Sequence, residues 1–227
     1  MSLLILSDYP PLGNEGIAMS VLSHRIIQAV ASDATGVVTR RYSRRYPRHR
    51  IGQNLNLPTF IAWDCTSFGL KFLRRNLRYK ADDFLQTAWL RFHRRRFTAV
   101  REVLGLSGPN WHFLKTLADH ARLLNCSYSV YVVDDYEETS EKLRLEPPGF
   151  VHQRVHHYLH AARRVFAICP GMAERLAEAY QIKAAIVYPV ADQFEATSSS
   201  PSTPERVVYV GSLGPTYLPQ LTECAAL

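Results

Sequence analysis

The chain has 227 residues, 47% of them hydrophobic, which is enough for a buried core, so we expect a globular protein. Its formal net charge is +7, and no run of about 18 uninterrupted apolar residues occurs, so a membrane-spanning helix is not supported. The start "MSLLILSDYPP" has neither a basic segment nor a small-residue cleavage site, which argues against a secretory signal and favours the cytoplasm.

The first elements along the chain follow a strand, helix, strand pattern. Residues 3–9, "LLILSDY", form a short apolar run that ends in polar residues and prolines. Residues 16–30 carry apolar side chains at helical spacing, and residues 35–41, "TGVVTRR", again indicate a strand. A helix that connects two strands is what parallel pairing requires, so we expect an α/β protein with a parallel sheet.

Positive charge is concentrated in the first half of the chain. Residues 40–50, "RRYSRRYPRHR", contain six arginines, and ten more basic residues lie between Lys71 and Arg101. Three interpretations remain open: a solvated basic surface, a patch for anionic lipid headgroups or an anionic carbohydrate, and a nucleic-acid interface. The last is least favoured because no recognition motif accompanies the charge. The patch is assigned to Arg40, Arg41, Arg44 and Arg45.

A long helix is predicted over residues 81–104. Its apolar stripe comprises Ala81, Phe84, Leu85, Ala88, Trp89 and Phe92. The arginines Arg91, Arg94 and Arg95 lie largely off that stripe, so a basic face is expected in solvent.

The second half continues the alternation. Helices are expected over 111–124, 149–164 and 169–180, and strands over 128–136, 165–169 and 183–192. Residues 196–205, "ATSSSPSTPE", are the clearest part of a linker, because they are polar and offer nothing to bury. After the linker, "RVVYVGSLGPTYLPQLTECAAL" begins the alternation again. The cysteines form no C-x-x-C pair, so we expect reduced thiols rather than a zinc site or disulfides; they are Cys65, Cys126, Cys169 and Cys224.

Four segments in this order resemble a known family: "ILSDYPPLGNEGIA", "YSVYVVDDY", "ARRVFAICPGMAERLAEAYQIKAAIVYPVAD" and "RVVYVGSLG". They are similar to the N-terminal half and interdomain crossover of retaining glycosyltransferases with the GT-B fold, of the group-1 (family 4) type. The resemblance implies a Rossmann-like, doubly wound parallel sheet over residues 1–192 that holds the acceptor, and a linker over 193–205. Residues 206–227 would then begin a truncated domain that holds the nucleotide-sugar donor.

A glycine-containing loop follows the first strand. Gly13, Asn14 and Gly16 lie between a strand's carboxyl end and a helix start, where free N–H groups can meet a phosphate. The pattern is not G-x-G-x-x-G, so a nicotinamide cofactor is disfavoured, and a plain tight turn is an equal alternative. By resemblance, this loop would approach the phosphates and the transferred sugar of the donor, which is a substrate and not a cofactor.

Two adjacent carboxylates, Asp134 and Asp135, follow the strand "YSVYVV". Successive side chains of a strand point to opposite faces, so both cannot enter one pocket. By resemblance Asp134 stands next to the reacting sugar, where the family has His, and a carboxylate there can stabilise an oxocarbenium-like transition state. Asp135 matches the family's acidic second position. The alternative is that both residues cap a following turn or helix. A paired-metal site is disfavoured, because D-x-D spacing is absent.

Two further features have simpler interpretations. His152, His156 and His160 share a helix face and could bind a metal, but a solvated face or a partner contact is favoured. Cys169 stands where the family usually has a capping Ser, and we interpret it as a replaced cap and not a reactive thiol.

The resemblance also predicts which parts of the donor site are missing. The family carries a basic pair shortly after the first strand of the second domain, and "VGSLGPTYLPQL" retains only Gly211 and Gly214 of that site. Stabilising the leaving diphosphate is a large part of lowering the barrier, so we expect these 227 residues alone to be inactive.

The hypothesis from sequence is therefore transfer of a sugar, with retention, from a nucleotide sugar to a polysaccharide or lipid-linked acceptor. It includes peripheral contact with an anionic membrane, no metal and no nucleic acid. The alternative is a non-catalytic Rossmann-like domain that binds an anionic partner through its basic patch.

Overall fold

In the computed structural model the described residues are 2–12, 18–40, 51–65, 68–70, 74–142 and 146–188. Met1–Val190 form one compact unit. The expected linker and second-domain start, with Gly211 and Gly214, lie outside the described residues, so the domain boundaries stay a prediction.

The opening strand, helix, strand pattern is confirmed. Strand β1 (Leu3–Ser7), helix α1 (Ala18–Ala29) and strand β2 (Ala34–Thr39) follow in that order, and β1 pairs with β2 in parallel. A short 3-10 turn, η2 (Ala31–Asp33), joins α1 to β2. The other elements are β3 (Thr59–Ile61), α2 (Arg75–His93), η4 (Arg94–Phe97), β4 (Glu102–Ser107), α3 (His112–Leu124), β5 (Ser127–Val132), α4 (Tyr136–Lys142), α5 (Pro148–Ala161), β6 (Arg164–Ala167), α6 (Pro170–Tyr180) and β7 (Ala185–Ile186).

Within the described residues the sheet has seven strands in the order β3-β2-β1-β4-β5-β6-β7, and every neighbouring pair is parallel. The chain moves outward from β1 to β3 and then returns to place β4 on the other side of β1. This reversal is the topological switch point at which ligands bind in open α/β sheets, at the carboxyl ends of the strands.

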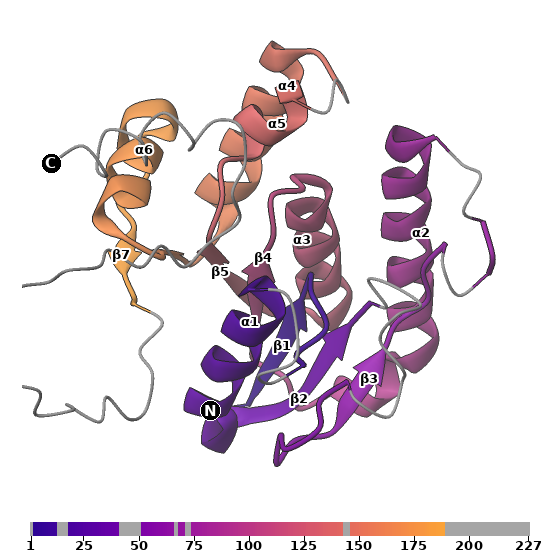
Figure 1. Ribbon diagram of the computed structural model, residues 1–227. Helices are drawn as coiled ribbons and strands as arrows, with labels where there is room; N and C mark the ends of the chain where they lie inside the picture. Colours follow the sequence, from indigo (N-terminus) through magenta and orange to yellow (C-terminus); the bar gives the residue numbers. More distant parts are fainter. Residues whose placement is uncertain are drawn as a thin grey trace, which may run out of the picture. The chain divides into compact units, whose positions relative to one another are not determined.

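Helices cover both faces of the sheet (Figure 1). Side chains of α2, α3, α5 and α6 form one core with residues of the strands, among them Leu4, Val103 and Val130. On the other face Ile5 and Val37 pack with Ile27 of α1. The α/β, Rossmann-like, doubly wound parallel sheet predicted from the sequence is therefore confirmed.

The prediction of one helix over residues 81–104 is wrong in its second half. Helix α2 ends at His93, η4 follows, and Glu102–Ser107 form β4 beside β1. The strand contains Gly105, and a Cβ on it would lie 2.4 Å from Cδ2 of Leu117, so this strand and α3 approach closely because the side chain is absent. Periodicity alone did not reveal the strand, because Leu104 also fits a helical repeat.

The predicted orientation of α2 was also wrong in part. Phe84 and Phe92, expected in the core, are 71% and 77% exposed, whereas Asp82, Asp83 and Gln86 are buried. The helix is rotated because its carboxylates find partners inside the domain, as described below. The expected exposure of the basic face is confirmed, since Arg91, Arg94 and Arg95 are exposed.

Candidate functional site

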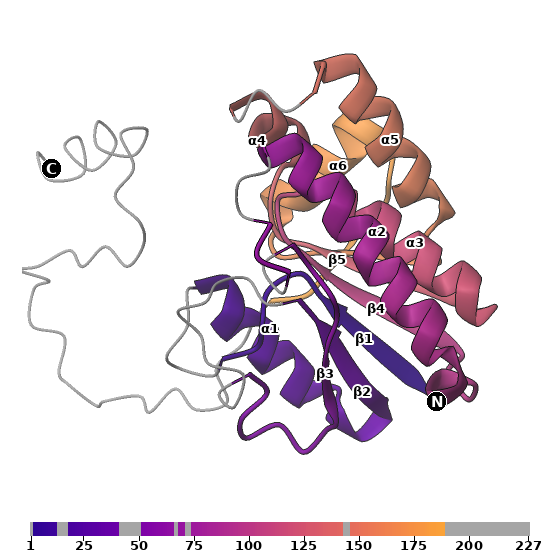
Figure 2. The same ribbon diagram turned by 90° about the vertical axis from the view of Figure 1, so that its right-hand side faces the viewer.

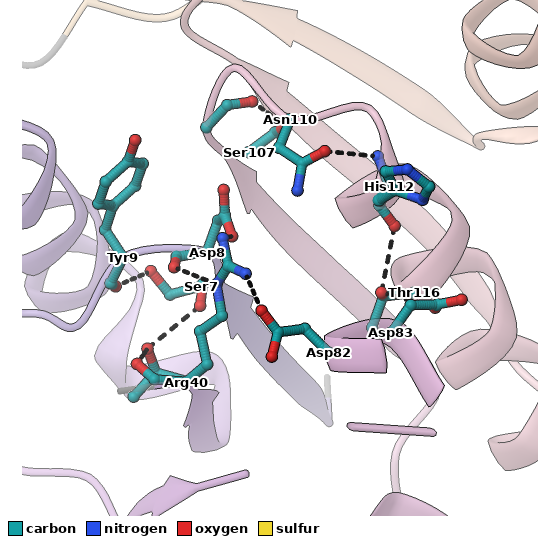
Figure 3. A network of polar contacts seen from close by, with 12 residues as sticks. Ser7, Asp8, Tyr9, Arg40, Asp82, Asp83, Ser107, Asn110, His112 and Thr116 are labelled. Atoms are coloured by element: carbon teal, nitrogen blue, oxygen red, sulfur yellow. Dashed lines mark hydrogen bonds and ion pairs between the residues drawn. The ribbon is translucent and has the colours of Figure 1, made fainter. Parts of the chain in front are cut away.

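Segments that follow three strands meet at the carboxyl edge of the sheet (Figure 3). Asp8 follows β1, Arg40 follows β2, and Asn110 follows β4 after a short turn. Because parallel strands end at the same edge, residues far apart in the sequence come together there. This edge flanks the switch point between β1 and β4.

The centre of this edge is an ion-pair network around Arg40. Its guanidinium lies 2.6 Å from Oδ1 of Asp8 and 3.3 Å from Oδ2 of Asp82, and its Nε donates to the carbonyl of Asp8 at 3.3 Å. The backbone N–H of Cys65 donates to Oδ1 of Asp82 at 2.6 Å. The side chains of Arg40, Asp8 and Asp82 are 10%, 3% and 5% exposed, so the charges compensate one another away from water.

Burial shapes the ionisation of this network. Burial raises the pKa of the Asp8 carboxyl above its usual value, while the positive charge of Arg40 opposes the shift. Burial acts to lower the pKa of Arg40, but the carboxylates of Asp8 and Asp82 outweigh it and raise that pKa. Arg40 therefore stays charged at all physiological pH values.

Close packing leaves little space in the network. A Cβ on Gly108 would lie 2.4 Å from Cε2 of Tyr9 and 2.5 Å from Oδ2 of Asp8, so only glycine fits this turn. The cavity lined by Asp8, Arg40, Asp82 and their neighbours is about 10 Å³, enough for about one water molecule. The network is therefore a rigid frame and not itself a sugar pocket.

Helix α3 begins at this edge. Oδ1 of Asn110 accepts the backbone N–H of His112 at 3.1 Å, and the ring of His112 stacks on Trp111 with centroids 4.0 Å apart. Burial lowers the pKa of His112 to about 4, and the charges of Lys80, Lys115 and Arg40 act in the same direction. His112 is therefore neutral near pH 7.

Asp134, the first carboxylate after β5, is exposed. Its Oδ1 accepts the backbone N–H of Asp135 at 2.9 Å. It lies at the same edge of the sheet as Asp8, because the two residues follow the carboxyl ends of the parallel strands β5 and β1. The pKa of the neighbouring Tyr136 hydroxyl is raised, chiefly by burial and further by the charges of Asp8 and Asp134. Tyr136 donates to Oγ of Ser107 at 2.7 Å, which ties the end of β5 to the end of β4. An exposed carboxylate at this position can stabilise a cationic transition state.

Asp135, in contrast, has a structural role. Its Oδ1 accepts the backbone N–H groups of Glu137 and Glu138 at 2.8 and 3.0 Å, which is N-capping of α4. Its Oδ2 lies 2.9 Å from Nε of Arg175 on α6. The two adjacent aspartates therefore differ in their surroundings, as expected, but not through strand alternation, because β5 ends at Val132 and Asp135 caps the helix that follows.

We expect Asp135→Ala to lower the free energy of unfolding by about 1–2 kcal/mol, because it removes the cap of α4 and an exposed ion pair. Urea denaturation measures the change. Glu141→Ala, an exposed position of the same helix, is the matched control and should change stability by less than about 0.5 kcal/mol. An equal effect of both substitutions would contradict the capping role.

Most other predicted site residues lie outside the described part of the chain. These are Gly13, Asn14, Gly16, Arg41, Arg44 and Arg45, in addition to Gly211 and Gly214. Arg40, assigned from sequence to the basic patch, lies in the buried network instead of on an open surface.

The histidines of α5 contact neighbouring groups. Nδ1 of His152 lies 2.8 Å from Oε1 of Glu137, and Nε2 of His160 lies 2.9 Å from the carbonyl of Tyr180. The ring centroids of His156 and His160 lie 4.1 Å apart. Across the described residues no group of three or more His, Cys, Asp or Glu side chains is arranged to hold a metal ion. Cys169 is the N-cap of α6 and is exposed, and its side chain makes no capping hydrogen bond.

Sequence reasoning missed Asp8, Asp82, Asn110 and His112. One signal was present: Asp8 follows an apolar strand, as Asp134 does, and a carboxylate at the end of a parallel strand points to the ligand-binding edge. Asp82 and His112 gave no such signal, because each occupies an ordinary position of a predicted helix.

No protein-family model and no curated protein matches the sequence. Among solved structures the chain is similar to UGT89C1 of Arabidopsis thaliana in complex with UDP, at 12% identity and a TM-score of 0.47. The match covers 82% of this chain and 48% of that one, so the chain spans about half the length of that protein. We draw no functional conclusion from so distant a likeness.

Proposed function

We propose that residues 1–192 are the acceptor-binding domain of a retaining glycosyltransferase of the GT-B, family 4-like type. It would transfer a sugar from a nucleotide sugar to a polysaccharide or lipid-linked acceptor. The observation that carries the proposal is the position of Asp134, an exposed carboxylate at the carboxyl edge of a doubly wound parallel sheet. The order of motifs along the sequence supports the same assignment.

The described residues suggest a division of roles at this edge. The network of Asp8, Arg40 and Asp82 would hold the ends of β1 and β2 rigid, and Asp135 would fix the start of α4. Asp134 would then face the sugar and stabilise the positive charge that develops on its ring. The loop with Gly13 and Gly16 would approach the donor phosphates, and a second domain would complete the donor site.

A panel of nucleotide sugars, incubated with the longest natural form of the chain and candidate acceptors, tests the proposal. Release of the nucleotide and formation of a glycosylated product are the readouts. We expect Asp134→Asn to lower kcat by about 10- to 100-fold with a smaller change in KM, because the charge is needed mainly in the transition state. Glu141→Gln, an exposed carboxylate of α4, is the matched control and should keep full activity.

The outcome also separates the proposal from a non-catalytic anion-binding domain, which the exposed basic residues of α2 and η4 favour. Absence of turnover in the longest form, together with saturable binding of an anionic partner, would favour that second function. For the 227-residue chain itself we expect no turnover, because "VGSLGPTYLPQL" lacks the basic pair that would neutralise the leaving diphosphate.

A further inference from the structure

The outward side of α2 presents large apolar side chains to solvent. Leu77, Phe84 and Phe92 are 55%, 71% and 77% exposed. Spaced by seven and eight residues, they lie on one side of the helix, opposite the buried Asp82 and Gln86. Several large apolar side chains exposed on one side of a helix are a feature of interaction sites.

Two aromatic residues near the edge strand β3 extend this set. The ring of Trp63 lies 6.3 Å from that of Phe92 and 6.3 Å from that of Phe68, and Trp63 and Phe68 are 37% and 55% exposed. Beside them the surface is hollowed by about 390 Å³ between β3 and the end of α2, with Trp63, His93 and Arg96 in its lining. We call Leu77, Phe84, Phe92, Trp63 and Phe68 the α2 surface. Helix α2 lies along the flank of the sheet, beside β3 (Figure 2).

The exposed charges contributed by residues 74–97 are positive. Among the side chains that the structure describes there, six basic residues are exposed: Arg74, Lys80, Arg91, Arg94, Arg95 and Arg96. Lys80 pairs with Glu146 at 3.3 Å, whereas the arginines around Phe92 have no acidic residue of this segment beside them in solvent. Over residues 74–97 the acidic residues are Asp82 and Asp83, which are 3% and 8% exposed and face Arg40 and Lys115 inside the domain. The solvent side of the segment therefore combines aromatic rings with arginines and has no exposed negative charge within those residues.

We propose that the α2 surface docks on an anionic lipid membrane, with Phe84 and Phe92 inserted at the level of the headgroups and the arginines beside lipid phosphates. A helix with aromatic side chains among arginines is suited to the surface of an anionic membrane, where the acyl chains are apolar and the headgroups carry negative charge. Trp63 would lie at the same depth, where indole rings are favoured.

Other occupants fit the surface less well. A second copy of this chain in a symmetric contact would bring the same arginines against one another without a compensating acidic residue of this segment. A nucleic acid would explain the arginines, but not the protruding Leu77 and Phe84 on the convex side of a helix. This inference does not depend on the proposed function.

Sedimentation with vesicles tests the proposal. The 227-residue chain is mixed with vesicles of phosphatidylcholine alone and with vesicles that contain about one third phosphatidylglycerol. We expect binding to the anionic vesicles only, weakened by salt, and a blue shift of tryptophan fluorescence. Trp63 is the exposed tryptophan, since Trp89 and Trp111 are 5% and 4% exposed, so Trp63→Phe should remove the shift.

Matched variants separate the contributions of the rings and the charges. The double variant Phe84→Ser and Phe92→Ser should lower partitioning into anionic vesicles by at least about 10-fold, because it removes the two rings that would be buried in the membrane. The pair Arg91→Gln and Arg95→Gln should have a similar effect. The controls are Phe150→Ser and Arg25→Gln, which remove an exposed ring from α5 and an exposed charge from α1, and both should bind like the wild type.

Three results would overturn the proposal. One is the absence of sedimentation with anionic vesicles, and another is equal binding by the Phe84→Ser, Phe92→Ser variant. The third is tight binding of random duplex DNA or single-stranded RNA at a concentration at which anionic vesicles do not bind. Because all substituted side chains are exposed, a folding defect is not expected, and circular dichroism of each variant checks this.

Discussion

Replacing Arg40 with Met is expected to lower the free energy of unfolding by about 3–5 kcal/mol. The substitution leaves Asp8 and Asp82 buried without their shared cation, 2.6 and 3.3 Å from the lost guanidinium. Removal of one partner of a buried ion pair costs far more than the net value of the pair, because the remaining carboxylate stays desolvated. Urea denaturation followed by circular dichroism measures the change.

The matched control for Arg40 is Arg25→Met, an exposed arginine of α1, which should change stability by less than about 0.5 kcal/mol. The double variant Asp8→Asn, Arg40→Met should recover part of the loss, since one of the two uncompensated carboxylates is removed. If Arg40→Met does not fold, Arg40→Lys keeps the charge and should fold with an intermediate stability. Equal stability of Arg40→Met and the wild type would show that the network does not hold the strand ends.

Acidification from pH 7 to pH 5 is expected to lower the contribution of two buried histidines to the free energy of unfolding by about 4 kcal/mol. Burial lowers the pKa of both His112 and His120 to about 4. In the unfolded chain each regains its ordinary pKa of 6.5, so between pH 6.5 and pH 4 the unfolded state binds more protons. Their contribution is therefore present above pH 6.5 and is lost as the pH falls toward 4.

His120→Leu should remove about half of this pH dependence. Nδ1 of His120 lies 2.8 Å from the carbonyl of Thr116, and among the described residues its buried Nε2 has no hydrogen-bond partner. His157→Gln, an exposed position of α5, is the control and should keep the full dependence. Unfolding is compared at pH 7, 6 and 5. The raised pKa of the Asp8 carboxyl acts in the opposite direction, but it does so equally in the wild type and in the variant, so the difference between the two profiles reports on His120. Equal pH profiles of His120→Leu and the wild type would contradict the burial of this ring.

Local sequence features predict some elements of this fold and not others. Strand β1 and helix α6 were predicted because a short apolar run and apolar residues at helical spacing are properties of neighbouring residues. Strand β4 was missed because its place is decided by pairing with β1 and β5, and "EVLGLS" has no local feature that excludes a continuing helix. The different surroundings of Asp134 and Asp135 were predicted, but which of them caps α4 was not.

The sequence by itself determined the parallel α/β sheet, the positive charge of the first half and the strand-end carboxylate Asp134. These follow from hydrophobic periodicity and residue type, which are local quantities. Only the tertiary structure decided that Arg40 is buried between Asp8 and Asp82, and that Phe84 and Phe92 face solvent. The physical reason is that helix α2 can turn either an apolar or a charged side inward. Its carboxylates are inside because Arg40, which follows β2, and Lys115 of α3 lie there to compensate them.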